Sequence, residues 1–323
     1  MTEPKQRLPG TTYFVTGVCE RHEFRLKPSE ETNAAFAVAM MEAAERHGIE
    51  VIAVCQMSSH YHSVVHDRYG FLSEYLRDFH GVMGRYGSTR DGVINCKFWS
   101  SQDSDTVALG DIASIIEKVA YTLANPTKDF IVERPEDWIG VRTRVADIGT
   151  GRGSIHRRPK RFFDDEGQVS EVVMVSSELP HEIADVIGLE TFRKRIAKRV
   201  ERYVAEAQAE VRAGTAKFLG VEKAKRLSVW HASNRPKGRG AGREAEARRR
   251  VAAADKGRLG AMLDALVAFR EQHRAAWLLL RQGLAAVVFP SGTWVAWRYY
   301  GAQRAASKSA NPTLEAGPVA APS

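Results

Sequence analysis

Apolar and polar positions alternate with two different periods along the first 130 residues. Short runs rich in β-branched and aromatic residues predict strands, and apolar residues spaced three and four apart predict helices. Ser29 and Gly48 are typical of the start and the end of a helix. In order, we predict strand 11–19, helix 29–47, strands 49–57 and 60–66, helix 71–86, strand 93–100 and helix 111–125.

This order of elements predicts an α+β fold. Ser58-Ser59 joins two strands as a hairpin turn, so the sheet is expected to be mostly antiparallel. Helices packed on one face of such a sheet give an arrangement close to the ferredoxin-like one. We place a Gly/Asp-rich break at 87–92, and we expect Pro126 to end the third helix.

The composition changes after residue 142, where a Gly-rich and Arg-rich stretch predicts a linker at 142–161. Later segments carry helical patterns at 190–213 and up to about 281, with a Gly/Arg hinge at 236–242. The last residues are rich in Ala, Pro and Ser, which predicts disorder. We therefore divide the chain into a domain at 1–145, a basic and mainly helical domain at 146–302 and a disordered tail at 303–323.

Charge is distributed unevenly between the two halves of this 323-residue chain, whose formal net charge is +8. Residues 1–130 carry 13 basic and 17 acidic residues, a net charge of −4, whereas residues 131–323 carry 34 and 22, a net charge of +12. Such asymmetry favours a polyanionic partner, of which nucleic acid is the usual one, held by the second half. A solvated basic surface is the alternative.

Several protein classes are excluded by what the sequence lacks. It has no run of about 18 uncharged apolar residues and no apolar segment after its N-terminus, so we expect neither a membrane span nor secretion. Its three cysteines form no CxxC pair, which indicates reduced thiols and no thiolate zinc site.

Two groups of residues could carry chemistry. On the strand at 60–66, His60 and His62 face the same side, so two imidazoles could hold one divalent cation if a third ligand came from elsewhere. Histidines that only pack in the core are the alternative. On the third helix, Tyr121 lies opposite the apolar stripe and Asn125 lies on nearly the same face. A nucleophile would then stand beside a metal ligand.

These residues carry a resemblance to a known family. Met57-Ser58-Ser59-His60-Tyr61-His62, followed by Tyr121-Thr122-Leu123-Ala124-Asn125-Pro126, resembles the single-tyrosine HUH transposases, which include the REP-associated tyrosine transposases. Pro135-Glu136-Asp137-Trp138 also matches a segment common in that family, and the resemblance covers residues 8–142. The chain departs from the family at Ser58-Ser59, where Pro-Asn is usual, and at 127–130.

The resemblance implies a ferredoxin-like HUH domain and a metal-dependent transposase that cleaves single-stranded DNA beside hairpins. Tyr121 would be the nucleophile that forms a 5′-phosphotyrosine, and His60, His62 and Asn125 would bind Mg²⁺ or Mn²⁺. We expect a cytoplasmic, nucleoid-associated bacterial protein; a homodimer stays open. Basic and aromatic residues expected at the DNA are Arg21, Arg25, Lys97, Trp99, Lys118, Arg157, Arg158 and Arg161.

Two other functions stay open at this point. One is an HUH nickase of replication or conjugation, although the chain has no P-loop; Lys118 resembles the assisting lysine of some replication initiators. The other is a DNA-binding protein that kept the fold without cleaving. The intact set of His60, His62, Tyr121 and Asn125 argues against this second alternative.

Overall fold

The structure is a computed structural model that describes residues 4–93, 96–101, 105–159, 172–232, 250–284 and 286–305. Its first part follows the predicted order closely. The elements are β1 (Thr11–Val18), α1 (Glu30–His47), β2 (Ile49–Gln56), β3 (His60–Asp67), α2 (Leu72–Asp91), β4 (Asp105–Leu109) and α3 (Ile112–Lys128). Ser29 caps α1 by accepting a hydrogen bond from the Thr32 N–H, and Gly48 ends it in the left-handed conformation, as predicted.

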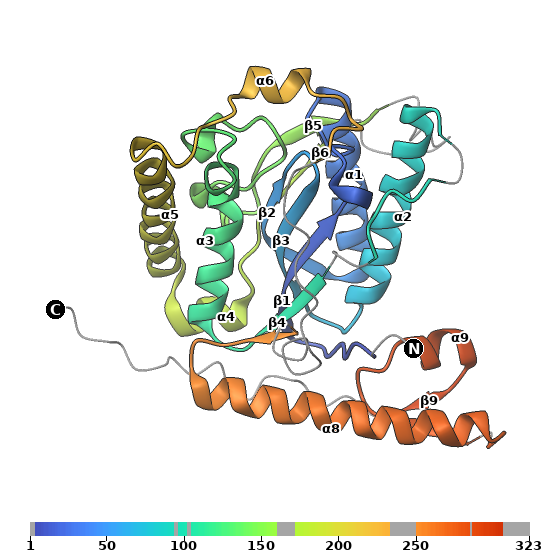
Figure 1. The fold of residues 1–323 in the computed structure, drawn as a ribbon. Helices are drawn as coiled ribbons and strands as arrows, with labels where there is room; N and C mark the ends of the chain where they lie inside the picture. The colour runs from blue at the N-terminus through green and yellow to red at the C-terminus, as the bar shows by residue number, and fades with distance from the viewer. Residues whose placement is uncertain are drawn as a thin grey trace.

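A five-stranded sheet in the order β2-β3-β1-β4-β7 forms the centre of the molecule (Figure 1). The first four strands are antiparallel to their neighbours, and β7 (Val251–Ala252) pairs in parallel with β4. The mixed α+β class and the mainly antiparallel sheet agree with the prediction. Because β7 comes from far along the chain, the second half of the sequence completes the sheet.

Helices cover both faces of the sheet, so the prediction of helices on one face was wrong. In Figure 1, α1 and α2 lie on one side, and α3 lies on the other with α5 (Leu189–Arg212) outside it. Side chains at alternate positions along the strands point to opposite faces of the sheet. Tyr13, Tyr61 and Val65 pack with α1 and α2, whereas Phe14 and Val64 pack with α3 and α5. The amphipathic stripe of each helix shows that it packs on a sheet, but it does not show on which face.

Two predicted boundaries between 87 and 100 were also wrong. Helix α2 continues through Gly87 and ends only at Gly92, which adopts the left-handed conformation. A Cβ on Gly87 would lie 2.1 Å from Cε2 of Phe98, so this glycine permits close packing and does not break the helix. The described residues between 93 and 100 form no regular strand; Trp99 makes only an isolated bridge to Cys19. The strand of this region is β4, at Asp105–Leu109.

Helix α3 begins where it was predicted and ends later. Asp111 caps it by accepting a hydrogen bond from the Ser114 N–H at 2.7 Å, and the other carboxylate oxygen accepts one from the Asp255 N–H at 2.9 Å. Pro126 lies inside the last turn and the helix runs on to Lys128, so the expected stop at Pro126 was wrong. A proline near the end of a helix removes few main-chain hydrogen bonds, and the Asp129 N–H still bonds to Asn125 O.

The second half of the chain is mainly helical where it is described, as predicted. Short strands and 3₁₀ turns accompany the helices. Besides α5 and β7, these elements are η2 (Pro135–Asp137), η3 (Val145–Asp147), β5 (Ile155–Arg157), β6 (Val172–Met174), α4 (His181–Ile187), α6 (Val221–Arg226), α8 (Lys256–Arg281), β8 (Val288–Phe289), α9 (Val295–Tyr300) and β9 (Gln303–Arg304). In the first half, the 3₁₀ turn η1 (Glu20–His22) follows β1. The predicted hinge at 236–242 and residues 306–323 of the predicted tail lie outside the described residues.

Buried hydrophobic residues from both sides of residue 145 pack in one cluster. The domain boundary at this residue stays a prediction. Ile183, Phe192 and Ile196 belong to the same buried cluster as Ile115 and Val119 of α3. The cysteines are free thiols, with Cys19 and Cys55 buried and Cys96 exposed. Within the described ranges, no helix is long and apolar enough to span a membrane.

The close approach of β1 to β3 gives a first prediction. Gly17 lies opposite Tyr61, and a Cβ there would stand 2.1 Å from the Tyr61 ring, which is fully buried. We expect Gly17→Ala to lower the free energy of unfolding by about 1–3 kcal/mol, because the core cannot absorb the added methyl group. Urea unfolding measures this change.

Gly260 provides the matched control for that substitution. It lies inside α8 with no atom within 4 Å of an added Cβ. Gly260→Ala should leave stability unchanged or raise it by about 0.5–1 kcal/mol, because alanine favours the helix. Equal stabilities for both alanine variants would contradict the close packing of Gly17.

Candidate active site

The two predicted histidines lie on the face of the sheet that α3 covers. Their ring centroids are 4.9 Å apart, while the Tyr61 ring between them points to the opposite face and packs against Phe36 and Phe79. This alternation confirms the placement that the strand pattern predicted for His60 and His62. Both imidazoles are buried.

Two hydroxyl groups orient the imidazole rings. Thr16 Oγ1, opposite His62 in the β1–β3 register, lies 3.0 Å from His62 Nδ1, and Ser59 Oγ lies 3.1 Å from His60 Nδ1. A hydroxyl oxygen can accept a hydrogen bond from an Nδ1–H group. For His62, that tautomer leaves the Nε2 lone pair for a metal ion, as in histidine ligands oriented by neighbouring groups. For His60, the hydrogen bond to the Asn125 amide oxygen requires the proton on Nε2, so Ser59 Oγ donates to Nδ1, and metal binding would need this proton to move to Nδ1.

Helix α3 brings Asn125 to His60. The Asn125 side chain is fully buried, and its Oδ1 lies 3.2 Å from His60 Nε2. Its Nδ2 has no hydrogen-bond partner in the described part of the chain, an arrangement that costs free energy in a buried amide. The buried amide is therefore only half satisfied: its Oδ1 pairs with His60, and its Nδ2 pairs with nothing in that part of the chain.

Asp129 is a residue that the sequence reasoning missed. Its Oδ2 lies 3.7 Å from His60 Nε2, at the end of α3. The signal was present, because Asp129 follows Asn125 by one helical turn and so continues the same helix face. Among the described residues, no three His, Cys, Asp or Glu side chains are grouped well enough to hold a metal ion. Any metal here would need the Asn125 amide oxygen as a ligand.

Tyr121 lies beside the histidines but is not as exposed as the helical pattern predicted. Its half-buried ring contacts His62 edge-on, with centroids 5.3 Å apart, and Phe14 with centroids 5.9 Å apart. Tyr203 of α5 approaches from the other side, at 6.3 Å. The face of α3 opposite its apolar stripe is thus covered by α5, which no pattern within α3 could indicate.

Two lysines place positive charge on the Tyr121 ring. Lys118 Nζ lies 5.5 Å from the centre of this ring, and Lys128 Nζ lies 5.2 Å from it. Positive charge near a phenol favours its ionised form, and it also attracts a phosphate group. Burial lowers the pKa of Lys118, with Glu117 opposing the shift. Lys128 was not among the predicted site residues, although it follows Tyr121 by two helical turns.

Helix α5 is fastened to α3 at this place. The Tyr203 hydroxyl donates a hydrogen bond to Glu117 Oε1, and Arg199 Nε forms an ion pair with Glu117 Oε2 at 3.1 Å. Lys128 Nζ also lies 4.1 Å from the centre of the Tyr203 ring. A segment of the second half therefore supplies one wall of the candidate site.

The other residues predicted to contact DNA are placed very differently. Arg21, Lys97 and Arg157 are exposed, whereas Arg161 lies outside the described residues. Arg158 is paired with Glu42, and Trp99 is half-buried, stacked on His80 with ring centroids 4.4 Å apart.

Arg25 does not lie on the surface where a phosphate contact would need it. Its side chain is fully buried, and it donates hydrogen bonds to Asp91 Oδ2 at 3.2 Å and to Lys97 O at 2.7 Å. The guanidinium group also packs over the Phe98 ring. These contacts assign Arg25 to the core, where it orders the segment that carries Lys97.

Comparisons with known proteins find similarity among solved structures. No protein-family model matches the chain, and no curated protein matches it. Among solved structures, the chain is similar to a REP-associated tyrosine transposase bound to a REP hairpin, with 19% sequence identity and a TM-score of 0.39. The match covers 53% of this chain and 96% of that protein.

The buried lysine gives a prediction on stability and pH. The pKa of Lys118 is lower in the folded chain than in the unfolded chain, so unfolding takes up protons at pH values between the two. We expect Lys118→Met to raise the free energy of unfolding at pH 7 by up to about 1 kcal/mol, because it keeps the packing and removes the buried charge. This gain should shrink as the pH rises toward 10.

Urea unfolding at pH 7 and 9.5 measures the effect. Lys198→Met, on the exposed face of α5, is the control and should change stability little at either pH. A gain for Lys118→Met that is equal at both pH values would contradict the role of its charge.

Proposed function

We propose that this chain is a metal-dependent endonuclease and strand transferase that acts on single-stranded DNA through Tyr121, in the manner of single-tyrosine HUH transposases. One observation carries the proposal. His60, His62 and Asn125 converge within hydrogen-bonding and ring-contact distances, and the Tyr121 ring lies against His62. The strand order β2-β3-β1-β4 with α1 and α2 on one face is consistent with a ferredoxin-like HUH domain.

The side chains at this site fit a divalent cation. Two imidazole nitrogens, an amide oxygen and the nearby Asp129 carboxylate form a mixed nitrogen and oxygen set, which suits Mn²⁺ and, through its oxygens, Mg²⁺. His60, His62 and Asn125 would hold the ion. When bound, it would polarise a non-bridging oxygen of the scissile phosphate and so lower the barrier to attack.

Tyr121 would act as the nucleophile in the covalent step. Its Oη loses a proton and attacks phosphorus, forming the Tyr–O–P bond, while the bond from phosphorus to the 3′ oxygen breaks. The departing 3′ oxygen takes up a proton and leaves as a free 3′-OH. Lys118 and Lys128, whose ammonium groups lie near the Tyr121 ring, would counter the charge of the phosphate. Because the phosphotyrosine keeps the energy of the broken bond, another 3′-OH can reverse the step and rejoin strands.

The substrate proposed here is single-stranded DNA beside a hairpin. The half of the chain with net charge +12 supports a polyanionic partner, and α5 of that half already forms a wall of the site. Exposed Arg21 and Lys97 are candidates for phosphate contacts, because the Glu20 N–H bonds to Phe98 O and so brings their two segments together. We propose a role in DNA transposition in the bacterial nucleoid.

Removing the hydroxyl group of Tyr121 tests whether this residue is the nucleophile. Incubation with single-stranded DNA from the flanks of its own gene and Mn²⁺ should give a covalent protein–DNA adduct on a denaturing gel. Tyr121→Phe should abolish this adduct, because the ring packing stays and only the attacking oxygen is lost. Tyr203→Phe is the matched control, and we expect it to keep forming the adduct because its hydroxyl bonds to Glu117 and takes no part in the attack. Hairpin binding by the wild-type chain without any adduct would instead indicate a DNA-binding protein that does not cleave.

The metal site is tested without any cleavage. We expect the chain to bind Mn²⁺ in a titration followed by electron paramagnetic resonance. His62→Ala and Asn125→Ala should each weaken binding by about tenfold or more, because each removes a donor atom. His181→Ala, whose side chain is 69% exposed, is the control and should bind like the wild type. Unchanged affinity in both site variants would contradict this ligand set.

A further inference from the structure

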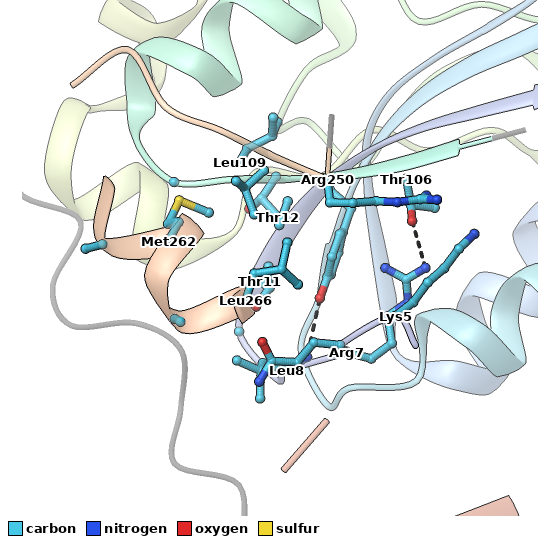
Figure 2. Close-up of a pocket in the computed structure, with 18 of the residues that line it drawn as sticks. Lys5, Arg7, Leu8, Thr11, Thr12, Thr106, Leu109, Arg250, Met262 and Leu266 are labelled. Carbon is cyan, nitrogen blue, oxygen red and sulfur yellow. Dashed lines mark hydrogen bonds between the residues drawn. The ribbon is translucent and has the colours of Figure 1, made fainter. Parts of the chain in front are cut away.

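A cavity lies away from the histidine site, at the end of the sheet where β1 begins. Its volume is about 460 Å³, and the N-terminal segment, β4, β7 and α8 form its walls (Figure 2). None of His60, His62, Tyr121 or Asn125 lines it. The proposed catalytic site therefore gives no account of this cavity.

One wall of the cavity is positively charged. Lys5, Arg7 and Arg250 gather on the same side of it in Figure 2, and Arg258 and Arg270 line it as well. Arg250 forms an ion pair with Asp105. The described residues that line the cavity include no carboxylate.

Arg7 is the buried member of this wall. Only 6% of the residue is exposed, and its Nη2 donates a hydrogen bond to Thr106 Oγ1 at 2.7 Å. Its Nε is buried and has no hydrogen-bond partner among the residues that the structure describes. A buried guanidinium without a full set of acceptors costs free energy, and an anion in the cavity would supply them.

Lys5 lies at the exposed rim of the cavity, and its pKa reflects the positive charges near it. Loss of water around its ammonium group and the positive charges of Arg7 and Arg250 lower the pKa of Lys5 to about 8, with Asp105 opposing the shift. Cations that lower one another's proton affinity attract an anion more strongly than a single surface lysine does.

The opposite wall carries apolar side chains, with Arg258 and Arg270 on the same helix, α8. Figure 2 shows Leu109, Met262 and Leu266 on the side away from the basic residues. Gly110 lets α8 approach closely, because a Cβ there would lie 2.3 Å from Met262 Sδ. The cavity therefore offers an apolar surface and a cationic surface across a space in the usual size range of small-molecule sites.

We propose that this cavity binds a nucleotide, with the phosphate against Lys5, Arg7 and Arg250 and the base against Leu109, Met262 and Leu266. Charged donors bind phosphate strongly, and the buried Arg7 Nε is a donor that no described residue satisfies. Inorganic phosphate would leave the apolar wall unused. The nucleotide is either free or one unit of a DNA strand, and both share this chemistry.

The test is isothermal titration of the full chain at pH 7 with deoxyadenosine monophosphate, a single-stranded oligonucleotide, inorganic phosphate and octyl phosphate. We expect the mononucleotide to bind more tightly than inorganic phosphate or octyl phosphate. Arg7→Gln and Lys5→Gln should each weaken its binding by about tenfold or more, because each removes a charged donor to phosphate. Arg46→Gln, an exposed cation on α1, is the control and should bind like the wild type.

The same experiment distinguishes a free nucleotide from one unit of a DNA strand. Tight binding of the mononucleotide indicates a free nucleotide, whereas tight binding of the oligonucleotide alone, lost in Lys5→Gln, indicates a unit of a strand. Lys5→Gln keeps the test valid if Arg7→Gln fails to fold, because Lys5 is exposed. The proposal would be overturned if octyl phosphate bound more tightly than the nucleotides. It would also be overturned if the wild type and Lys5→Gln bound the nucleotide with equal affinity. Loss of the Tyr121 adduct with intact nucleotide binding would affect only the proposed catalytic function.

Discussion

The antiparallel register between β1 and β3 is the constraint on which the candidate site depends. It sets Thr16 opposite His62, so that a hydroxyl orients one imidazole, and it sets Gly17 opposite Tyr61, so that a large ring fits where no Cβ stands. A shift of this register by one residue would turn both histidines to the α1 and α2 face and Tyr61 to α3. The core and the site are therefore fixed by the same pairing.

Helix α3 connects this register to the rest of the molecule. It packs on the sheet through Ile115 and Val119 and against α5 on its outer side, so Tyr121 is held between two layers. Asp111, which caps the start of α3, accepts a hydrogen bond from the Asp255 N–H just before α8. The last turn of α3 places Asn125 beside His60. One helix thus joins the edge of the basic cavity to the histidine pair.

The two halves of the chain differ in net charge, but elements of both halves form the same sheet and core. The acidic first half carries the histidines and the tyrosine, whereas the basic second half supplies α5 beside Tyr121, and β7 and α8 at the β4 edge of the sheet. Tyr203 and Arg199 attach α5 to Glu117, and Arg250 pairs with Asp105. Positive charge from the second half is therefore brought to the sheet by contacts with acidic residues of the first half.

The sequence by itself determined the strands and helices whose signals are local, such as the Ser29 cap, the Gly48 stop and the alternation of His60, Tyr61 and His62. These follow from main-chain geometry and side-chain direction within a few residues. It could not determine that Gly87 packs against Phe98, that α5 covers Tyr121, or that Arg25 is buried, because each depends on a distant segment. Asn125 and His60 could be chosen as residue types from the sequence. Only the tertiary structure, through packing of α3 on the sheet, decided that their side chains meet.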